Sequence, residues 1–280
     1  MKNKNMSAPK LLKSAFTTGN YYQAMNAALK RLDGNHQMLH YPYQHKENEN
    51  FMQAQQNLIN YCVNLFPSMK DKSVLDLGCG NGTVSFYLAE HFDAGEIVGI
   101  DINTNNVEIA NAEKEKKGIL NVEFFEDDAQ NLSQISDNSF DYILNIESAF
   151  HYPDKHQFLN ELHRVLKPCG HFIIADIVHT RKKGSWFNAW KKKMNFHHWS
   201  IHDYMGAIEQ KNLQVISQND ISPEVINGFK QYREYLKDSK LKETPKDLIL
   251  KFFFVINVKL NIYLLKKKRR YYVLYGKNAE

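Results

Sequence analysis

The most constraining feature of the sequence is a run of alternating glycines, Gly78, Gly80 and Gly82, directly after the apolar run Val74–Leu77. A helical pattern of apolar residues follows over residues 84–91. Glycine can adopt positive φ and has no Cβ, so a turn rich in glycine lets a ligand approach the backbone closely. The order therefore predicts a strand, a tight ligand-binding turn and a helix.

The spacing of these glycines narrows the class of ligand. A dinucleotide-binding turn of the form Gly-x-Gly-x-x-Gly needs its third glycine at position 83, which is Thr83. A P-loop needs Lys followed by Ser or Thr after its last glycine, and Thr83 and Val84 occupy those positions. Neither motif describes this turn.

Further apolar runs follow, and each ends in polar residues. Residues 96–101 end in Asp101, residues 121–126 lead into Asp128 and Ala129, and residues 140–145 end in Asn145. After a helical pattern to position 166 and a breaker at residues 167–170, residues 171–176 end in Asp176. Alternating strands and helices predict a parallel sheet covered by helices on both faces, with its ligand at the carboxyl ends of the strands.

This succession of motifs, over about 100 residues, resembles the class I methyltransferases that use S-adenosylmethionine (SAM). Residues 147–154, Glu-Ser-Ala-Phe-His-Tyr-Pro-Asp, are similar to a segment of the tocopherol, sterol and sugar methyltransferases. The resemblance implies a doubly wound, Rossmann-like α/β fold with a seven-stranded, mostly parallel sheet and a helical cap. It also implies SAM as the cofactor.

The resemblance further assigns residues to the cofactor. Asp101 is expected to accept hydrogen bonds from both ribose hydroxyls, Asp128 to bind the adenine amino group, and the Ala129 amide to lie near the ring. The complete expected set is Asp76, Gly78, Gly80, Gly82, Asp101, Ile102, Asp128, Ala129 and Asn145.

Three residues are candidates for the chemistry. Methyl transfer requires alignment of the nucleophile, exclusion of water and often removal of a proton. In sugar-modifying members of the group, a His in this segment and an Asp after the next strand have proposed base roles, which match His151 and Asp176. Glu147 is expected to face the sulfonium or a cationic intermediate, or to bind the cofactor's amino group. In the alternative interpretations, His151 only bonds the backbone and Asp176 only caps a turn.

Three regions are expected along the chain: residues 1–66 as an N-terminal helical lid with helices over 21–32 and 50–65, residues 67–180 as the SAM-binding core, and residues 181–280 as cap helices inserted around the last strands.

Residues 40–43, with Tyr41 and Tyr43, resemble a stretch that folds over the cofactor in the family; core packing is the alternative. An apolar acceptor pocket or ordinary core is expected from the cap aromatics Trp186, Phe187, Trp190, Phe196, Trp199 and Tyr204.

Charge is divided unevenly along the chain. Residues 181–280 contain 21 Lys and Arg against 9 Asp and Glu, a formal charge of +12, although the whole chain carries +5. Such a surplus indicates either a solvated face or an anionic substrate, carrier protein or membrane surface. The helix expected over residues 245–270 joins apolar residues 252–254 to basic residues 266–270, so packing on the cap and peripheral membrane contact both stay open.

Composition excludes several classes of protein. The three cysteines are too few for a disulfide framework, and none of the twelve histidines has metal-ligand spacing, so no metal is expected. The apolar residues 252–265 are too few to span a bilayer and no signal-peptide core is present near the start, so a cytoplasmic protein is expected. No nucleic acid is expected as a partner, because residues 145–148 lack the Asn/Asp-Pro-Pro-aromatic motif of DNA amino-methyltransferases.

The sequence therefore predicts a SAM-dependent methyltransferase of a hydrophobic or amphipathic small molecule, with an anionic acceptor left open and O-methylation favoured over C-methylation. Two alternatives stay open. One is a SAM-binding partner subunit without catalysis, and the other is a methyltransferase of a lipid or carrier-bound substrate.

Overall fold

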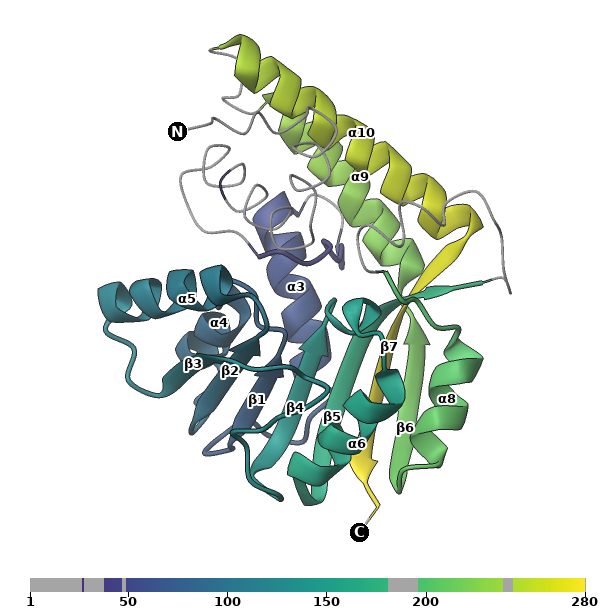
Figure 1. Ribbon diagram of the computed structural model, residues 1–280. Helices are drawn as coiled ribbons and strands as arrows, with labels where there is room; N and C mark the ends of the chain where they lie inside the picture. The colour runs from purple at the N-terminus through teal and green to yellow at the C-terminus, as the bar shows by residue number, and fades with distance from the viewer. Residues whose placement is uncertain (1–26, 28–37, 47–48, 181–195, 239–243, 280) are drawn as a thin grey trace, which may run out of the picture.

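The computed structural model describes residues 27, 38–46, 49–180, 196–238 and 244–279 (Figure 1). The helix predicted over residues 21–32 falls outside these residues except for position 27, as do the cap aromatics Trp186, Phe187 and Trp190. In the described ranges, no helix combines the length and the apolar character needed to cross a bilayer.

A seven-stranded sheet forms the centre of the fold, with its strands in the order β3-β2-β1-β4-β5-β7-β6. The strands are β1 Val74–Leu77, β2 Ile97–Asp101, β3 Val122–Glu126, β4 Phe140–Ile146, β5 Leu166–His179, β6 Leu213–Asp220 and β7 Arg269–Asn278. β7 pairs antiparallel with β5 and β6, and the pairs among β1 to β5 are parallel. The predicted doubly wound, mostly parallel sheet is confirmed.

Helices cover both faces of the sheet (Figure 1). The described helices are α3 Phe51–Val63, α4 Thr83–His91, α5 Thr104–Lys117, the 3-10 turn η1 Ala149–His151, α6 Lys155–Val165, α8 Ile201–Glu209, α9 Ser222–Asp238 and α10 Pro245–Lys267. In Figure 1, α9 and α10 lie above the carboxyl ends of β1, β4 and β5. These two helices are inserted between β6 and β7, whereas α8 packs beside β6.

The side chains of the strands alternate between two cores. Leu75 and Leu77 face the cluster that contains α6 and α8, and Val74 faces the cluster that contains α3, α4 and α5. Each of these side chains is fully buried, and burying one stabilises the fold by about 1.5–3 kcal/mol. A sheet covered on both faces explains why its strands are nearly continuous apolar runs.

The helix predicted over residues 50–65 is α3, and its start follows from a capping box. Asn50 Oδ1 accepts from the Gln53 amide at 2.9 Å, and the Asn50 amide donates to Gln53 Oε1 at 3.0 Å. These two bonds satisfy donors that the helix itself leaves unpaired.

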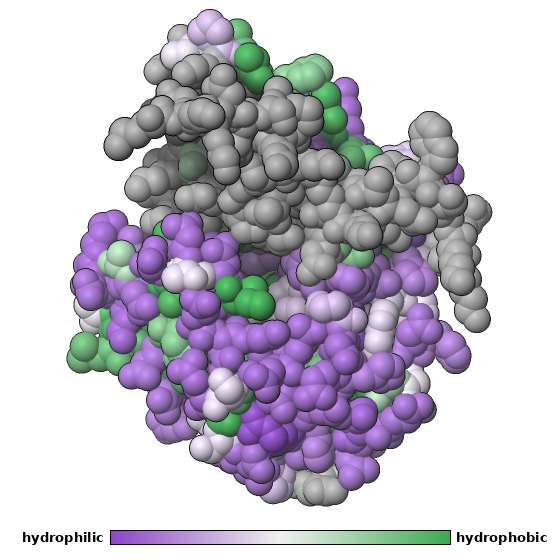
Figure 2. Space-filling model, in the orientation of Figure 1, coloured by the Kyte–Doolittle hydropathy of each residue, from purple (hydrophilic) through white to green (hydrophobic). Residues whose placement is uncertain are grey.

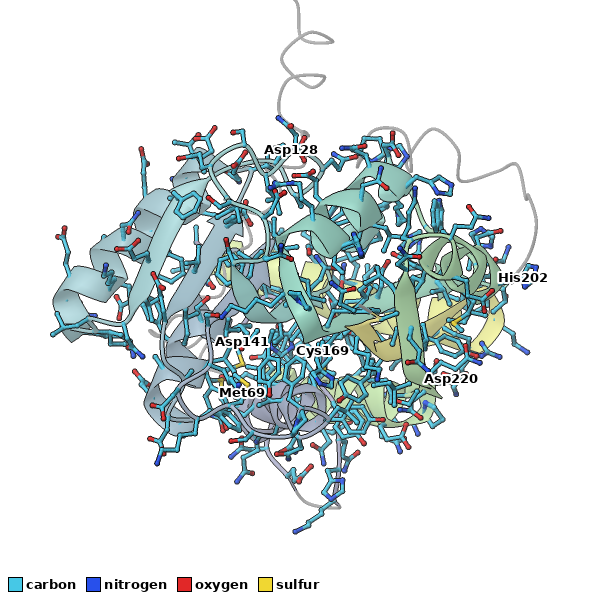
Figure 3. The ribbon with its side chains drawn as sticks, turned by 90° about the horizontal axis from the view of Figure 1, so that it is seen from below. Met69, Asp128, Asp141, Cys169, His202 and Asp220 are labelled. Atoms are coloured by element: carbon cyan, nitrogen blue, oxygen red, sulfur yellow. The ribbon has the colours of Figure 1, made fainter. Side chains whose placement is uncertain are left out.

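The breaker predicted at residues 167–170 is wrong. β5 begins at Leu166, directly after α6, and includes these residues. The pairing with β4 shifts between Phe140 and Tyr142, and Cys169 adopts a φ of 58°, so an irregularity in the strand accommodates the Pro-Cys-Gly sequence. Figure 3 shows Cys169 near Asp141, close to the start of β4.

Candidate active site

A cavity of about 570 Å³ lies at the carboxyl ends of β1, β2 and β4. Its walls come from residues 38–40, the glycine turn, the residues after β2 and β3, and residues 146–153. Cavities of roughly 300–1,000 Å³ hold small molecules and cofactors. The strand order reverses between β1 and β4, which is where open α/β sheets bind their ligands.

The glycine turn forms one wall and packs tightly on the residues after β4. The amides of Gly78 and Cys79 both donate to the Ile100 carbonyl, at 2.7 and 2.9 Å. Gly78 has a φ of +75°, and a Cβ placed on it would lie 2.3 Å from Cβ of Ser148. Only glycine therefore fits this position, and the backbone of the turn is brought to the edge of the cavity.

Asp101 lies across the turn, at the end of β2. Its Oδ2 accepts from the Gly80 amide at 2.9 Å and its Oδ1 accepts from the Asn103 amide at 2.8 Å. Burial raises the pKa of this carboxyl, although the bonds from Asn103 and Gly80 oppose the shift. Asp101 lines the cavity together with its neighbour Ile102.

Three residues expected at the cofactor lie behind the cavity wall. Asp76 accepts from the Ser85 hydroxyl at 2.6 Å, and burial raises its pKa to about 6. Gly82 is the N-cap of α4. Asn145 is fully buried and donates to the Leu77 carbonyl at 3.0 Å. None of these three belongs to the cavity lining, whereas the other six expected cofactor residues do.

Glu147 stands at the end of β4 in an uncommon conformation, with a φ of 53°. Its Oε1 accepts from the Tyr41 backbone amide at 2.6 Å. Burial raises the pKa of Glu147 to about 8, although the bond from Tyr41 acts in the opposite direction. The carboxyl is therefore largely protonated at neutral pH and lines the cavity in that state.

His151 reaches the cavity from η1. Its ring lies 4.4 Å from the ring of Phe150 and 5.3 Å from the ring of Phe196, measured between centroids. The imidazole therefore lies against aromatic rings at the cavity wall, where its position is constrained by packing.

Asp176 is not brought to the cavity. Its Oδ2 accepts from the Tyr204 hydroxyl at 2.5 Å and its Oδ1 accepts from the Ile177 amide at 2.7 Å. Burial raises the pKa of Asp176, and the nearby Lys155 opposes that shift. The carboxyl is held inside the core by these donors.

The aromatic residues predicted to cover the site lie in the core instead. Tyr41 packs on Phe229 with 4.6 Å between ring centroids, and Tyr43 packs on Tyr61 at 5.1 Å. Neither tyrosine lines the cavity, so the lid interpretation of these two side chains is wrong. The preceding residues, 38–40, line the cavity instead of the two tyrosines.

The cap aromatics divide in a similar way. Trp199 packs on Tyr204 with 5.3 Å between ring centroids, and neither side chain lines the cavity. Tyr204 is fully buried, because it supplies the hydroxyl that Asp176 needs inside the core. Two described cap aromatics contact candidate catalytic residues: Tyr204 bonds Asp176 in the core, and Phe196 packs on His151 at the cavity wall.

Several lining residues were not identified from the sequence. The Ser148 hydroxyl donates to the Leu77 carbonyl at 2.9 Å and accepts from the Tyr152 hydroxyl at 2.9 Å. Both residues lie inside the segment 147–154, which was the available signal. His40, 6% exposed, faces the Tyr41 carbonyl through Nδ1 at 3.0 Å, and burial lowers its pKa to about 4. This imidazole is therefore neutral at physiological pH.

The charge of the lining is one-sided. Four carboxyl groups belong to the described cavity wall, those of Asp101, Asp127, Asp128 and Glu147, and this described wall contains no Lys or Arg. Asp128, labelled at the upper edge of the molecule in Figure 3, also accepts from the Gln130 amide at 2.9 Å. Such a wall suits a cation and hydroxyl or amino donors, whereas a phosphate group would lack a cationic partner. The residues present thus fit a sulfonium nucleoside.

Comparisons with known proteins agree with this geometry. A protein-family model described as a methyltransferase domain matches residues 68–238. The fatty-acid O-methyltransferase of Mycolicibacterium smegmatis is 29% identical over 204 residues, which are 70% of this chain and 66% of that protein. The phthiotriol/phenolphthiotriol dimycocerosates methyltransferase of Mycobacterium leprae is 28% identical over 178 residues, 64% of this chain and 58% of the relative. The chain thus spans less than two thirds of the length of either relative.

Among solved structures, phosphoethanolamine N-methyltransferase 2 of Haemonchus contortus in complex with SAM superposes with a TM-score of 0.79. The match covers 100% of this chain and 62% of that chain at 17% identity. At this identity the match shows a shared fold.

Proposed function

This chain belongs to the methyltransferase domain family of class I SAM-dependent enzymes, and we propose that it transfers the methyl group of SAM to an oxygen atom of a hydrophobic or amphipathic lipid-like molecule. The observation that carries the proposal is the cavity wall with four carboxyl groups and, among its described residues, no Lys or Arg. The three aspartates of this wall, with no cation among its described residues, suit a positively charged nucleoside, and Glu147 adds a further negative charge when it ionises.

SAM, when bound, supplies a methyl group on a positively charged sulfur. We assign the ribose hydroxyls to the Asp101 carboxylate and the adenine to Asp128 and the Ala129 amide. The glycine turn at Gly78 and Gly80 gives the cofactor access to backbone without Cβ atoms. Glu147 places a buried carboxyl in the same wall, where its negative form would stabilise a neighbouring cation.

We assign to His151 the removal of the proton from the acceptor. Its imidazole lines the cavity and has the chemistry of a base near neutral pH. Asp176 is the weaker candidate, because its two carboxylate oxygens already accept from Tyr204 and Ile177 and its side chain does not reach the cavity. We propose that Asp176 supports the floor of the site from the core.

Two observations support a lipid-like acceptor. The named relatives act, by their names, on a fatty acid and on phthiotriol dimycocerosates, both of which are hydrophobic. The cavity wall also contains the apolar side chains of Met38, Leu39 and Ile146 close to Glu147 and His151. The oxygen as the reacting atom follows the first relative, and carbon methylation is the alternative.

The proposed function is tested by measuring methyl transfer from SAM to candidate acceptors. The protein is incubated with methyl-labelled SAM and, separately, a long-chain fatty acid and a long-chain alcohol, and the labelled product is identified by mass. Mild base releases label from a methyl ester but not from a methyl ether or a C-methyl product, so base-labile label identifies a carboxyl oxygen as the reacting atom. We expect base-labile label. The His151→Ala variant should lose turnover, and the His202→Ala variant, which changes an exposed histidine on α8, should retain it.

The second candidate function is a SAM-binding subunit that does not catalyse. It predicts that SAM and S-adenosylhomocysteine bind to the purified chain while no label reaches either acceptor or any component of a lipid extract. That result would overturn the proposed transfer and leave the cofactor assignment intact.

A further inference from the structure

The outer face of α10 carries a stripe of exposed apolar side chains. Their exposed fractions are 57% for Ile249, 63% for Phe252 and Phe253, 44% for Ile256, 41% for Leu260 and 52% for Tyr263. At 100° per residue these six positions fall within an arc of roughly 100°, and they extend for about 21 Å along the helix. We call this set the α10 stripe. In Figure 2, green apolar residues follow the position of α10 along the upper edge of the molecule.

The opposite face of the same helix is already used by the fold. Phe254, Val258 and Leu265 are between 1% and 7% exposed and pack into the protein. A helix that is apolar on both faces normally has both faces covered, and a soluble protein rarely exposes a contiguous patch of this kind without a partner. The α10 stripe therefore requires a covering surface.

The charge around the stripe indicates what that surface is. Lys259, Lys266 and Lys267 are exposed and lie beside the stripe or at its C-terminal end. Within residues 245–267, Asp247 is the only acidic residue. With its inner face packed on the protein, the helix presents an apolar strip edged by lysines, and such a strip can enter the acyl boundary of a bilayer while the lysines contact anionic headgroups.

We propose that the α10 stripe docks on an anionic lipid surface, with its aromatic and aliphatic side chains in the acyl boundary and its lysines at the headgroups. One part of this inference rests on the proposed function: if the acceptor is a lipid, the protein would take it from that surface.

Contacts in the structure connect α10 to the cavity. Asn261, on α10, accepts from the Tyr41 hydroxyl through Oδ1 at 2.7 Å. The backbone amide of the same tyrosine donates to Glu147 Oε1 at 2.6 Å in the cavity wall. Two hydrogen bonds through one residue thus connect α10 to the cavity wall.

A second copy of the chain is the competing occupant. Packing two α10 stripes together would bring the lysines of both copies to one interface, where Asp247 is the only acid that each helix supplies. Like charges without acidic partners oppose that association, whereas anionic headgroups provide the missing negative charge.

The experiment measures binding of the full chain to vesicles by sedimentation, without SAM or turnover. Vesicles of phosphatidylcholine alone are compared with vesicles that also contain phosphatidylglycerol. We expect preferential binding to the anionic vesicles, weakened by salt. Replacing Phe252 and Phe253 together by Ser should reduce binding about tenfold or more, and Lys266→Glu with Lys267→Glu should do the same.

Matched controls change the same residue types elsewhere. Leu120→Ser removes a 92% exposed leucine beyond α5, and Lys70→Glu reverses an exposed charge before β1. Both should bind vesicles like the unchanged protein. Equal vesicle binding by the unchanged protein and the variant with Ser at positions 252 and 253 would overturn the proposal. A dimer of the unchanged protein in solution that this variant does not form would also overturn it. Methyl transfer to the long-chain fatty acid without vesicles, measured separately, shows whether the proposed function itself has failed.

Discussion

The backbone amide of Tyr41 donates a 2.6 Å hydrogen bond to Oε1 of Glu147, across 106 positions of the sequence. The bond ties residues 38–46 to the end of β4 and closes one side of the cavity. It also contributes to burying a carboxyl group whose pKa is raised to about 8. We therefore expect both stability and cofactor binding to depend on the protonation of this one residue.

Glu147→Gln should remove part of the pH dependence of stability. The folded protein holds the Glu147 proton up to about pH 8, against 4.5 for an ordinary glutamate, so the free energy of unfolding falls as pH rises through this window. Gln mimics the protonated form and can still accept from Tyr41. We expect the variant to match the unchanged protein near pH 5 and to exceed it by a few kcal/mol near pH 8, measured by urea unfolding. Parallel pH curves for the two proteins would contradict this assignment.

The same carboxyl should make the preference for SAM over S-adenosylhomocysteine depend on pH. SAM carries the positive sulfur and the homocysteine product does not, so ionised Glu147 favours SAM alone. Between pH 6.5 and 9 we expect the ratio of the two dissociation constants to shift toward SAM by about tenfold, as measured by calorimetry. In Glu147→Gln the ratio should stay constant, and a shift that survives this substitution would place the responsible charge elsewhere.

Substitutions of Asp101 and His151 should have different effects, the first on SAM affinity and the second on the rate of turnover. Asp101→Ala removes the acceptor assigned to the ribose, and we expect SAM affinity to weaken by about 1–3 kcal/mol. Asp101→Asn tests the charge with the shape retained, and thermal unfolding of both variants checks that the turn at Gly80 still forms. His151→Ala should lower turnover by roughly 10²–10⁴-fold and leave SAM affinity nearly unchanged. Reversed effects would exchange the two roles.

The elements of the core could be predicted because local signals and global packing agree there. Strands buried on both faces leave continuous apolar runs, and the glycine turn needs residues without Cβ, so β1, β2, β4 and the turn followed from composition and spacing. The start of β5 could not be predicted at residues 167–170, because a Pro-Cys-Gly sequence is typical of a turn. In the structure the pairing with β4 passes from Leu166 to His171, so these residues form an irregularity inside the strand.

The cavity was harder to predict because the direction of a side chain depends on distant contacts. Asp76 and Asn145 lie one residue before the ends of β1 and β4, whereas Asp176, expected to end its strand, lies inside β5, which continues to His179. Ser85, Leu77 and Tyr204 hold the polar groups of these three residues in the core. Nor can a sequence show which side of residues 38–43 faces the site. The orientation of these residues depends on the packing of Tyr41 against α9, a distant contact that the pattern of apolar residues in the sequence does not predict.

Gly78→Ala and Gly118→Ala should separate steric overlap from backbone strain. Both glycines have a positive φ, +75° and +66°, but a Cβ at Gly78 would lie 2.3 Å from Cβ of Ser148, whereas a Cβ at Gly118 meets no atom within 4 Å. Gly118→Ala should therefore lower the free energy of unfolding by about 1 kcal/mol, the effect of the left-handed backbone alone. Gly78→Ala adds an overlap with residues that cannot move apart without opening the cavity wall, so we expect a loss of roughly 2–5 kcal/mol and of SAM binding. Urea unfolding and calorimetry measure the two effects, and equal losses of stability in both variants would show that the contact between the glycine turn and Ser148 does not constrain the site.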